Sequence, residues 1–262
     1  MKSDKTFQYP FFTGLLGLFA IITSKIIELT TGDKVPLIAW IASALIMISA
    51  LIIRFYSIDD VKFAEVILDS NPVDYDLKPQ KYIDWITIAM IVGLVATITI
   101  HFNFIAGMLV YLIMQISLIK AFSGIFVIDP KITFKHPKLK GITTITAAFW
   151  ILYVVIIYSV FVYSGADSLI VIPYIIFLGI MTHISWYGLS YERSPLFKYM
   201  IVLASAVFVF SDSLIGNEVY GVNKVNANLF HTIDITYVFN IFLMSQAILF
   251  LKDKSGMSVL KS

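Results

Sequence analysis

Residues 82–124 read YIDWITIAMIVGLVATITI, HFN and FIAGMLVYLIMQISLIKAFSG, which are two apolar stretches separated only by His101, Phe102 and Asn103. Each stretch is about 20 residues long, the length that an α-helix needs to cross a hydrocarbon core about 30 Å thick. The gap is too short to hold a domain, but it is long enough for a turn between antiparallel helices. The segment therefore predicts a pair of transmembrane helices.

Similar apolar runs occur along the rest of the chain. The expected spans are 11–29, 35–53, 82–100, 104–124, 143–163, 168–187, 197–215 and 232–251. The longest polar stretch, 54–81, has too little apolar content to form a soluble core, and we expect an interfacial helix at 61–68 within it. The chain is thus predicted to be all-α, a polytopic membrane helix bundle with eight transmembrane helices that form one transmembrane domain over residues 1–262.

Composition supports this class and excludes several others. Hydrophobic residues make up 59% of the chain and charged residues 14%, whereas soluble domains are about 45–50% apolar and about 25% charged. The chain has no cysteine, which excludes disulfides, thiolate metal sites and a cysteine nucleophile. The net charge of +2, without a basic patch, indicates that nucleic acid is not a partner.

Basic residues predict the orientation, because cytoplasmic loops are enriched in Lys and Arg. With eight spans, one side of the membrane holds 16 of the 19 basic residues, and the other side keeps only Lys25, Lys34 and Lys224. Both termini are therefore expected to be cytoplasmic.

Polar residues inside spans are costly and mark candidate sites. Asp212 is the strongest candidate because apolar residues flank Ser211-Asp212-Ser213 on both sides. Gln115 and Gln246 lie in the middle of their spans, where a hydrogen bond between helices is the alternative role. Asp234 lies three residues after His231 near the outer side, but no metal-binding spacing accompanies the pair, so we expect neither a metal nor a cofactor.

Four weak motifs occur in one order on this chain. They are Phe104-Ile105-Ala106-Gly107 with Tyr111, Tyr174 with Met181, Phe208-Val209-Phe210-Ser211-Asp212, and Phe242 with Ser245-Gln246. In this respect the chain resembles the YhhN family of eight-span membrane proteins, which includes the lysoplasmalogenases. The resemblance covers about residues 82–250, and the first two spans agree with the family only in number. It has two departures: Gln115 stands where the family usually has His, and Leu94 stands where the family has Asp.

The resemblance implies a hydrolase that cleaves the vinyl ether of a lysoplasmalogen to a fatty aldehyde and a glycerophospho-base. It implies a lysophospholipid or another single-chain amphiphile as partner, and the bacterial inner (cytoplasmic) membrane as location. Asp212 is then a catalytic residue, and Gln246, Gln115, Phe208, Tyr111, Tyr174 and Phe242 bind substrate. Because Leu94 replaces the expected Asp, reduced or lost activity is also consistent with the sequence.

Vinyl-ether hydrolysis begins with protonation of the alkene carbon and continues with addition of water to the resulting oxocarbenium ion. One carboxylic acid and one carboxylate suffice, as in glycosidases. Asp212 fills one role, and Asp234, Glu218 or His231 remain candidates for the other. The alternative is a non-catalytic protein of the same fold that binds or transports a lipid; an unrelated transporter is less favoured, since broken spans are few.

Pairs of residues four apart share a helix face. Phe208 with Asp212, Tyr111 with Gln115, and Phe242 with Gln246 form such pairs. We therefore expect Asp212, Gln115 and Gln246 to face a single pocket that opens toward the outer leaflet.

Overall fold

The computed structural model describes residues 5–32, 36–58, 78–126, 137–161, 171–191, 193–220, 228–252 and 260. The long helices are α1 (Lys5–Thr31), α2 (Pro36–Tyr56), α3 (Pro79–Phe102), α4 (Phe104–Phe122), α6 (Pro137–Phe161), α7 (Val171–Tyr187), α8 (Pro195–Tyr220) and α9 (Asn228–Gln246). A 3-10 turn, Ala247–Phe250, extends α9. The described residues contain no strand longer than an isolated β-bridge, such as the one between Ser57 and Leu260, so the all-α class is confirmed.

Seven helices in the described part of the chain are long and apolar enough to cross a membrane. The remaining expected span, 143–163, corresponds to α6, whose apolar stretch Leu139–Val155 is shorter. The polytopic bundle is therefore confirmed, while the count of eight spans stays a prediction. The interfacial helix expected at 61–68 lies outside the described residues.

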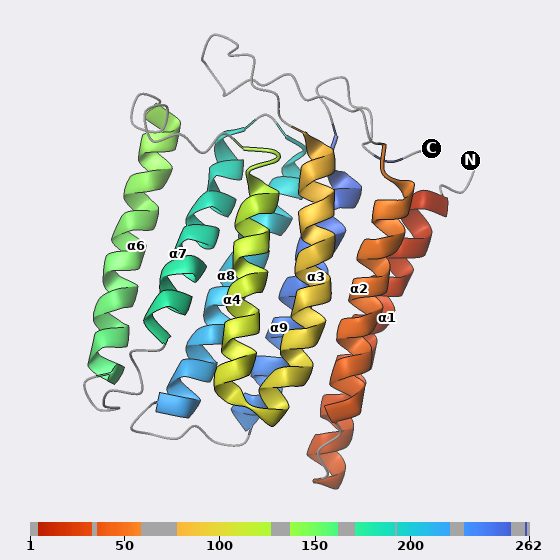
Figure 1. The fold of residues 1–262 in the computed structure, drawn as a ribbon, viewed down its shortest axis with the longest axis vertical. Helices are drawn as coiled ribbons and strands as arrows, with labels where there is room; N and C mark the ends of the chain where they lie inside the picture. The colour runs from red at the N-terminus through yellow and green to blue at the C-terminus, as the bar shows by residue number, and fades with distance from the viewer. Residues whose placement is uncertain are drawn as a thin grey trace.

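The helices stand side by side, with the beginning of α1 and the end of α9 at the same end of the bundle (Figure 1). In this view α6 lies at one edge and α1 and α2 lie at the other. Helix α9 is the most enclosed span: 72% of its apolar window is buried, against 33% for α1. Side chains of α9 that contact neighbouring helices are therefore shielded from lipid. A functional site inside the bundle is expected to use residues of this helix.

The turn between α3 and α4 is set by Asn103 and Gly107. The Asn103 side chain accepts a hydrogen bond of 3.0 Å from the Ala106 amide, which caps the start of α4. Gly107 lies directly against α3, because a Cβ added there would lie 2.5 Å from the Ile100 Cα. The two helices can approach this closely only because residue 107 has no side chain.

We expect Gly107→Ala to destabilise the protein by about 1–3 kcal/mol, the usual effect of overpacking against a backbone that cannot move aside. The measurement is thermal unfolding of the purified full chain in detergent. Gly141→Ala is the matched control, because an added Cβ at Gly141 meets nothing within 4 Å. Equal melting temperatures for the two variants would contradict the tight α3–α4 contact.

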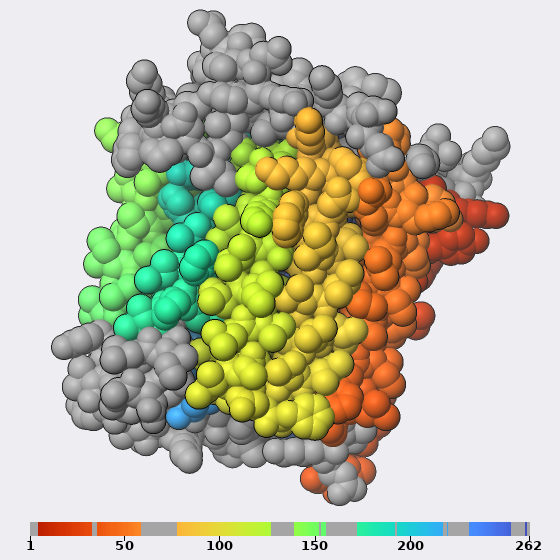
Figure 2. All heavy atoms as spheres, viewed as in Figure 1, coloured from red at the N-terminus to blue at the C-terminus, as the bar shows by residue number. Residues whose placement is uncertain are grey.

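Outward-facing side chains of the bundle are apolar. Figure 2 shows α2, α3 and α4 packed against one another across one face of the molecule. Large hydrophobic side chains are exposed on these helices, among them Leu51, Ile88, Val95, Leu109 and Ile113. A soluble protein rarely exposes such a continuous apolar surface, so this surface is suited to lipid.

The predicted orientation can be tested with single cysteines, since the native chain has none. Phe55 near the end of α2 and Phe102 at the end of α3 are 77% and 78% exposed, and they lie at opposite ends of the bundle. We expect a membrane-impermeant maleimide added outside cells to label Phe102→Cys and to spare Phe55→Cys. The reverse pattern would show that the termini are outside.

Candidate functional site

Asp212 lies on α8 in a triplet of polar residues that each reach a different helix. The Tyr174 hydroxyl on α7 donates a hydrogen bond of 2.6 Å to Asp212 Oδ2. Ser211 Oγ donates to the Ile233 carbonyl oxygen on α9 over 3.2 Å, and Ser213 Oγ donates to the Tyr153 hydroxyl on α6 over 3.2 Å. Because both serines bind neighbouring helices, the rotation of α8 is fixed and Asp212 is held between α7 and α9.

Tyrosine hydroxyls surround the Asp212 carboxyl group. Besides its bonded partner Tyr174, it interacts electrostatically with Tyr111, Tyr153 and Tyr237. These four side chains come from four different helices. Asp212 is therefore a single acidic group in an aromatic, hydroxyl-rich environment at the junction of the bundle's helices.

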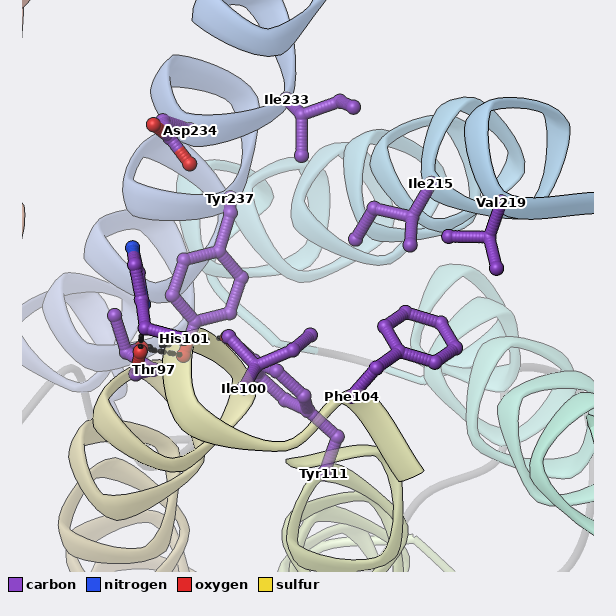
Figure 3. A pocket seen from close by; sticks show the side chains of 10 residues that line it. All are labelled: Thr97, Ile100, His101, Phe104, Tyr111, Ile215, Val219, Ile233, Asp234 and Tyr237. Carbon is purple, nitrogen blue, oxygen red and sulfur yellow. Dashed lines mark hydrogen bonds between the residues drawn. The ribbon is translucent and has the colours of Figure 1, made fainter. Parts of the chain in front are cut away.

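A cavity of about 240 Å³ lies at the end of the bundle that contains the α3–α4 turn. Asp212 and Tyr174 do not line it, but Tyr111 and Tyr237, which interact with Asp212, do. Its lining residues are Thr97, Ile100, His101, Phe104, Tyr111, Ile215, Val219, Ile233, Asp234 and Tyr237. Asp234 and Tyr237 approach from α9 on one side, while Ile215, Val219 and Phe104 lie toward the other (Figure 3). The walls are mainly apolar with a few polar groups, which is typical of sites for small organic ligands.

The inner end of the cavity is a hydrogen-bonded group of side chains. Thr97 Oγ1 lies 3.3 Å from both the Tyr111 and the Tyr237 hydroxyl oxygens, and the two tyrosine rings meet edge to face at 5.3 Å. The Tyr237 hydroxyl also donates to the Gly93 carbonyl oxygen over 3.2 Å. A Cβ at Gly93 would lie 3.0 Å from that hydroxyl, so glycine gives Tyr237 access to the α3 backbone.

Asp234, one turn before Tyr237 on α9, belongs to a group of charged residues shared by α1 and α9. Lys25 Nζ lies 2.5 Å from Asp234 Oδ2 and 2.8 Å from Glu28 Oε2. His231 Nδ1 lies 3.2 Å from the same Glu28 oxygen. Lys25 and Glu28 are only 5% and 9% exposed, so their charges are compensated inside the bundle rather than by water.

The sequence does not predict that Lys25 and Glu28 belong to a site: Lys25 enters only the prediction of orientation, and Glu28 enters none. A signal was present nevertheless. Lys25 and Glu28 are three residues apart, as are His231 and Asp234, so each pair shares a helix face. Opposite charges lie on these two helix faces, near the same side of the membrane. This pattern indicates that ion pairs join the two helices.

The comparisons with known proteins give a family but no individual relative. The sequence model of the YhhN family matches residues 72–248, which is more than half of the chain. The chain belongs to the YhhN family. Searches of the curated proteins and of the solved structures return no significant match.

In this YhhN family member, the structure brings together only some of the residues expected to form the site. Tyr174 binds Asp212 directly, Tyr111 lines the adjacent cavity, and the Phe208 ring contacts that of Tyr237 at 6.4 Å. Asp234 lines the same cavity. Glu218 lies on α8, but its side chain is outside the described part of the structure.

Gln246 and Phe242 lie elsewhere, so the expected single pocket with Asp212 is not what the structure shows. Gln246 Nε2 donates to Ser49 Oγ on α2 over 2.8 Å, and the Phe242 ring contacts that of Phe11 at 6.3 Å. Gln246 follows Ile233, the backbone partner of Ser211, by thirteen residues, or about 20 Å of helix rise. Both residues therefore serve the packing of α9 on α1 and α2.

Gln115 and Leu94 also lie outside the lining of the cavity. Gln115 is fully buried one turn below Tyr111. Leu94 is half-buried on α3, next to Gly93, whereas Thr97 on the same helix lines the cavity. Among the residues that the structure describes, no group of three or more His, Asp or Glu side chains is arranged to hold a metal ion.

Proposed function

We propose that this YhhN family member hydrolyses the vinyl ether of a lysoplasmalogen, with Asp212 as the proton donor. The observation that carries the proposal is the Asp212–Tyr174 pair beside an apolar cavity that has a second carboxylate, Asp234, in its wall. The cavity suits a single-chain amphiphile, because its apolar side chains bind the alkenyl chain and its polar groups face the head of the lipid.

In this proposal each oxygen of Asp212 has a distinct role. Tyr174 donates to Oδ2, so a proton carried by the carboxylic acid sits on Oδ1. Transfer of that proton to the alkene carbon leaves an oxocarbenium ion and an Asp212 carboxylate that stabilises it. Water then adds to the carbon bonded to the ether oxygen, and the hemiacetal collapses to the aldehyde and the free hydroxyl of the glycerophospho-base.

Asp234 is the candidate base for the attacking water, and Lys25 is the group that positions it. The ion pair of 2.5 Å holds Asp234 Oδ2, which leaves Oδ1 able to accept a proton from water. The same ion pair is also what a purely structural role in joining α1 and α9 requires, so it favours a second candidate function. In that alternative the cavity binds or moves a single-chain lipid without hydrolysis.

The two functions are separated by an assay of the purified full chain with two lysolipids that differ only at the ether. We expect a fatty aldehyde from the vinyl-ether lipid and none from the saturated alkyl-ether lipid, measured by mass spectrometry. Binding of both lipids without aldehyde would support the non-catalytic alternative and overturn the hydrolase.

Restoring the family's carboxylate offers a further test. The family pattern alone leads to the expectation that Leu94→Asp raises hydrolysis. The geometry leads to the opposite expectation: turnover is unchanged, because Gly93 is the residue of α3 that faces Tyr237, and Leu94 is turned about 100° away from it round the helix. The measurement is the initial rate of aldehyde release, and a clear rise above the native rate would show that residue 94 reaches the substrate.

A further inference from the structure

Two buried amide side chains lie one turn below the cavity, and neither has a hydrogen-bond partner in the described part of the chain. Gln115 on α4 and Asn240 on α9 are both 0% exposed. The side-chain oxygen and nitrogen of each are without a bond there. By contrast, Gln246, the other fully buried amide discussed above, donates from Nε2 to two serine hydroxyls. Buried polar groups are normally satisfied, so the pair points to a ligand.

The register of the two helices places the amides at the same depth. Helices α4 and α9 run in the same direction, and Tyr111 and Tyr237 meet across them. Gln115 follows Tyr111 by four residues and Asn240 follows Tyr237 by three. These steps correspond to rises of about 6 Å and about 4.5 Å.

The helical rotation turns both amides toward the same side. Relative to the two tyrosines, Gln115 is rotated by about +40° and Asn240 by about −60°, at 3.6 residues per turn. On two parallel helices whose tyrosine rings meet in the space between them, rotations of opposite sign turn both side chains to one side of the line that joins the axes. Helix α8 lies on that side of α9, because Phe208 contacts Tyr237 and Ser211 binds the Ile233 carbonyl. Both amides therefore face the interior between α4, α8 and α9.

We propose that Gln115 and Asn240 form an internal water-binding site beneath the floor made by Tyr111, Tyr237 and Phe208. Each amide offers donors on nitrogen and an acceptor on oxygen, so the pair suits a small neutral ligand that both donates and accepts. Water meets this requirement. An ion of either sign would use only half of each amide, and neither residue supplies a charge.

The site lies on the route to the reacting groups. The Tyr111 and Tyr237 hydroxyls separate the amides from the cavity, and both interact with Asp212. Hydrolysis consumes one water per turnover, and the apolar cavity walls exclude water once the lipid chain is bound. Water held by the amides is therefore the supply for the hemiacetal-forming step. This second part rests on the proposed function, whereas the binding site does not.

Radiolytic hydroxyl-radical footprinting of the full chain in nanodiscs tests the site directly, because radicals formed from bound water oxidise the adjacent side chains. Met114 is the reporter: it precedes Gln115 in the chain, is 0% exposed, and its sulfur lies close to Gly93 and so to the Tyr237 hydroxyl. We expect its oxidation to fall several-fold in the Gln115→Leu/Asn240→Leu variant and to stay at the native level in Gln246→Leu. Oxidation of Met114 in the double variant that equals or exceeds the native level overturns the site.

The lipid assay separates the two parts of the proposal. Labelled Met114 in a native protein that releases no aldehyde supports the water site and overturns the proposed hydrolysis. Loss of Met114 labelling in the double variant with unchanged aldehyde release overturns the supply role. Loss of both, with lipid binding kept, is the result expected.

Discussion

Asp212→Asn is expected to reduce aldehyde release from a lysoplasmalogen by about 10²–10⁴-fold, the contribution typical of a positioned general acid. Asparagine keeps the shape and can still accept the hydrogen bond from Tyr174, but it cannot deliver a proton to the alkene carbon. Binding of the lipid should be little changed, because the lining of the cavity is intact. The measurement is the single-turnover rate of the purified variant.

The matched control is Asp84→Asn. Asp84 lies near the other end of α3, where it forms an ion pair with Arg54 and accepts a hydrogen bond of 3.0 Å from Gln80. Asp84→Asn removes one aspartate carboxylate, as Asp212→Asn does, but it leaves the residues that line the cavity unchanged. Native turnover in Asp212→Asn, or an equal loss in Asp84→Asn, would place the chemistry elsewhere.

Lys25→Met is expected to destabilise the fold by about 3–5 kcal/mol, the usual effect of removing one partner from a buried ion pair. Lys25 is 5% exposed and binds two carboxylates; without it, both Asp234 and the buried Glu28 lose the Lys25 ammonium. The measurement is reversible unfolding in mixed micelles, by titration with SDS.

Two variants show whether charge compensation is the cause. Adding Glu28→Gln to Lys25→Met should recover part of the stability, because one uncompensated carboxylate is removed. Lys120→Met is the exposed control: Lys120 lies over the Trp85 ring at 4.4 Å, and its loss should cost about 0.5–1 kcal/mol. If the Lys25 and Lys120 variants lose equal stability, the ion pairs on α1 and α9 do not hold these helices together.

The length of apolar runs was sufficient to predict the helices, because crossing the bilayer demands a nearly fixed number of residues. The pair of helices over 82–124 and the turn at Asn103 follow from it. Asp212 could also be found, since a carboxylate flanked by apolar residues needs a protein partner. Its partner Tyr174 was named as a site residue from the family motif, although the bond between them was not.

Depth and face were harder to predict than the helices themselves. The spacing of Phe242 and Gln246 indicates a shared face, but it does not say that the pair lies toward the far end of α9, nine and thirteen residues beyond Ile233, the backbone partner of Ser211. Counting along the chain gives the depth of Leu94 in the membrane, but it does not show which way this residue faces on α3. Lys25 and Glu28 interrupt an apolar run, and only the packing of α1 on α9 shows that Asp234 binds Lys25 and that His231 lies beside Glu28.

The central claim is that water cleaves the bond on the alkenyl side of the ether oxygen, after protonation by Asp212. The most direct measurement is turnover of a lysoplasmalogen by the purified native chain in water enriched in ¹⁸O, with both products analysed by mass spectrometry. The account predicts fatty aldehyde together with a glycerophospho-base that carries no ¹⁸O. Aldehyde release no greater than that of Asp212→Asn, or ¹⁸O in the glycerophospho-base, would contradict it.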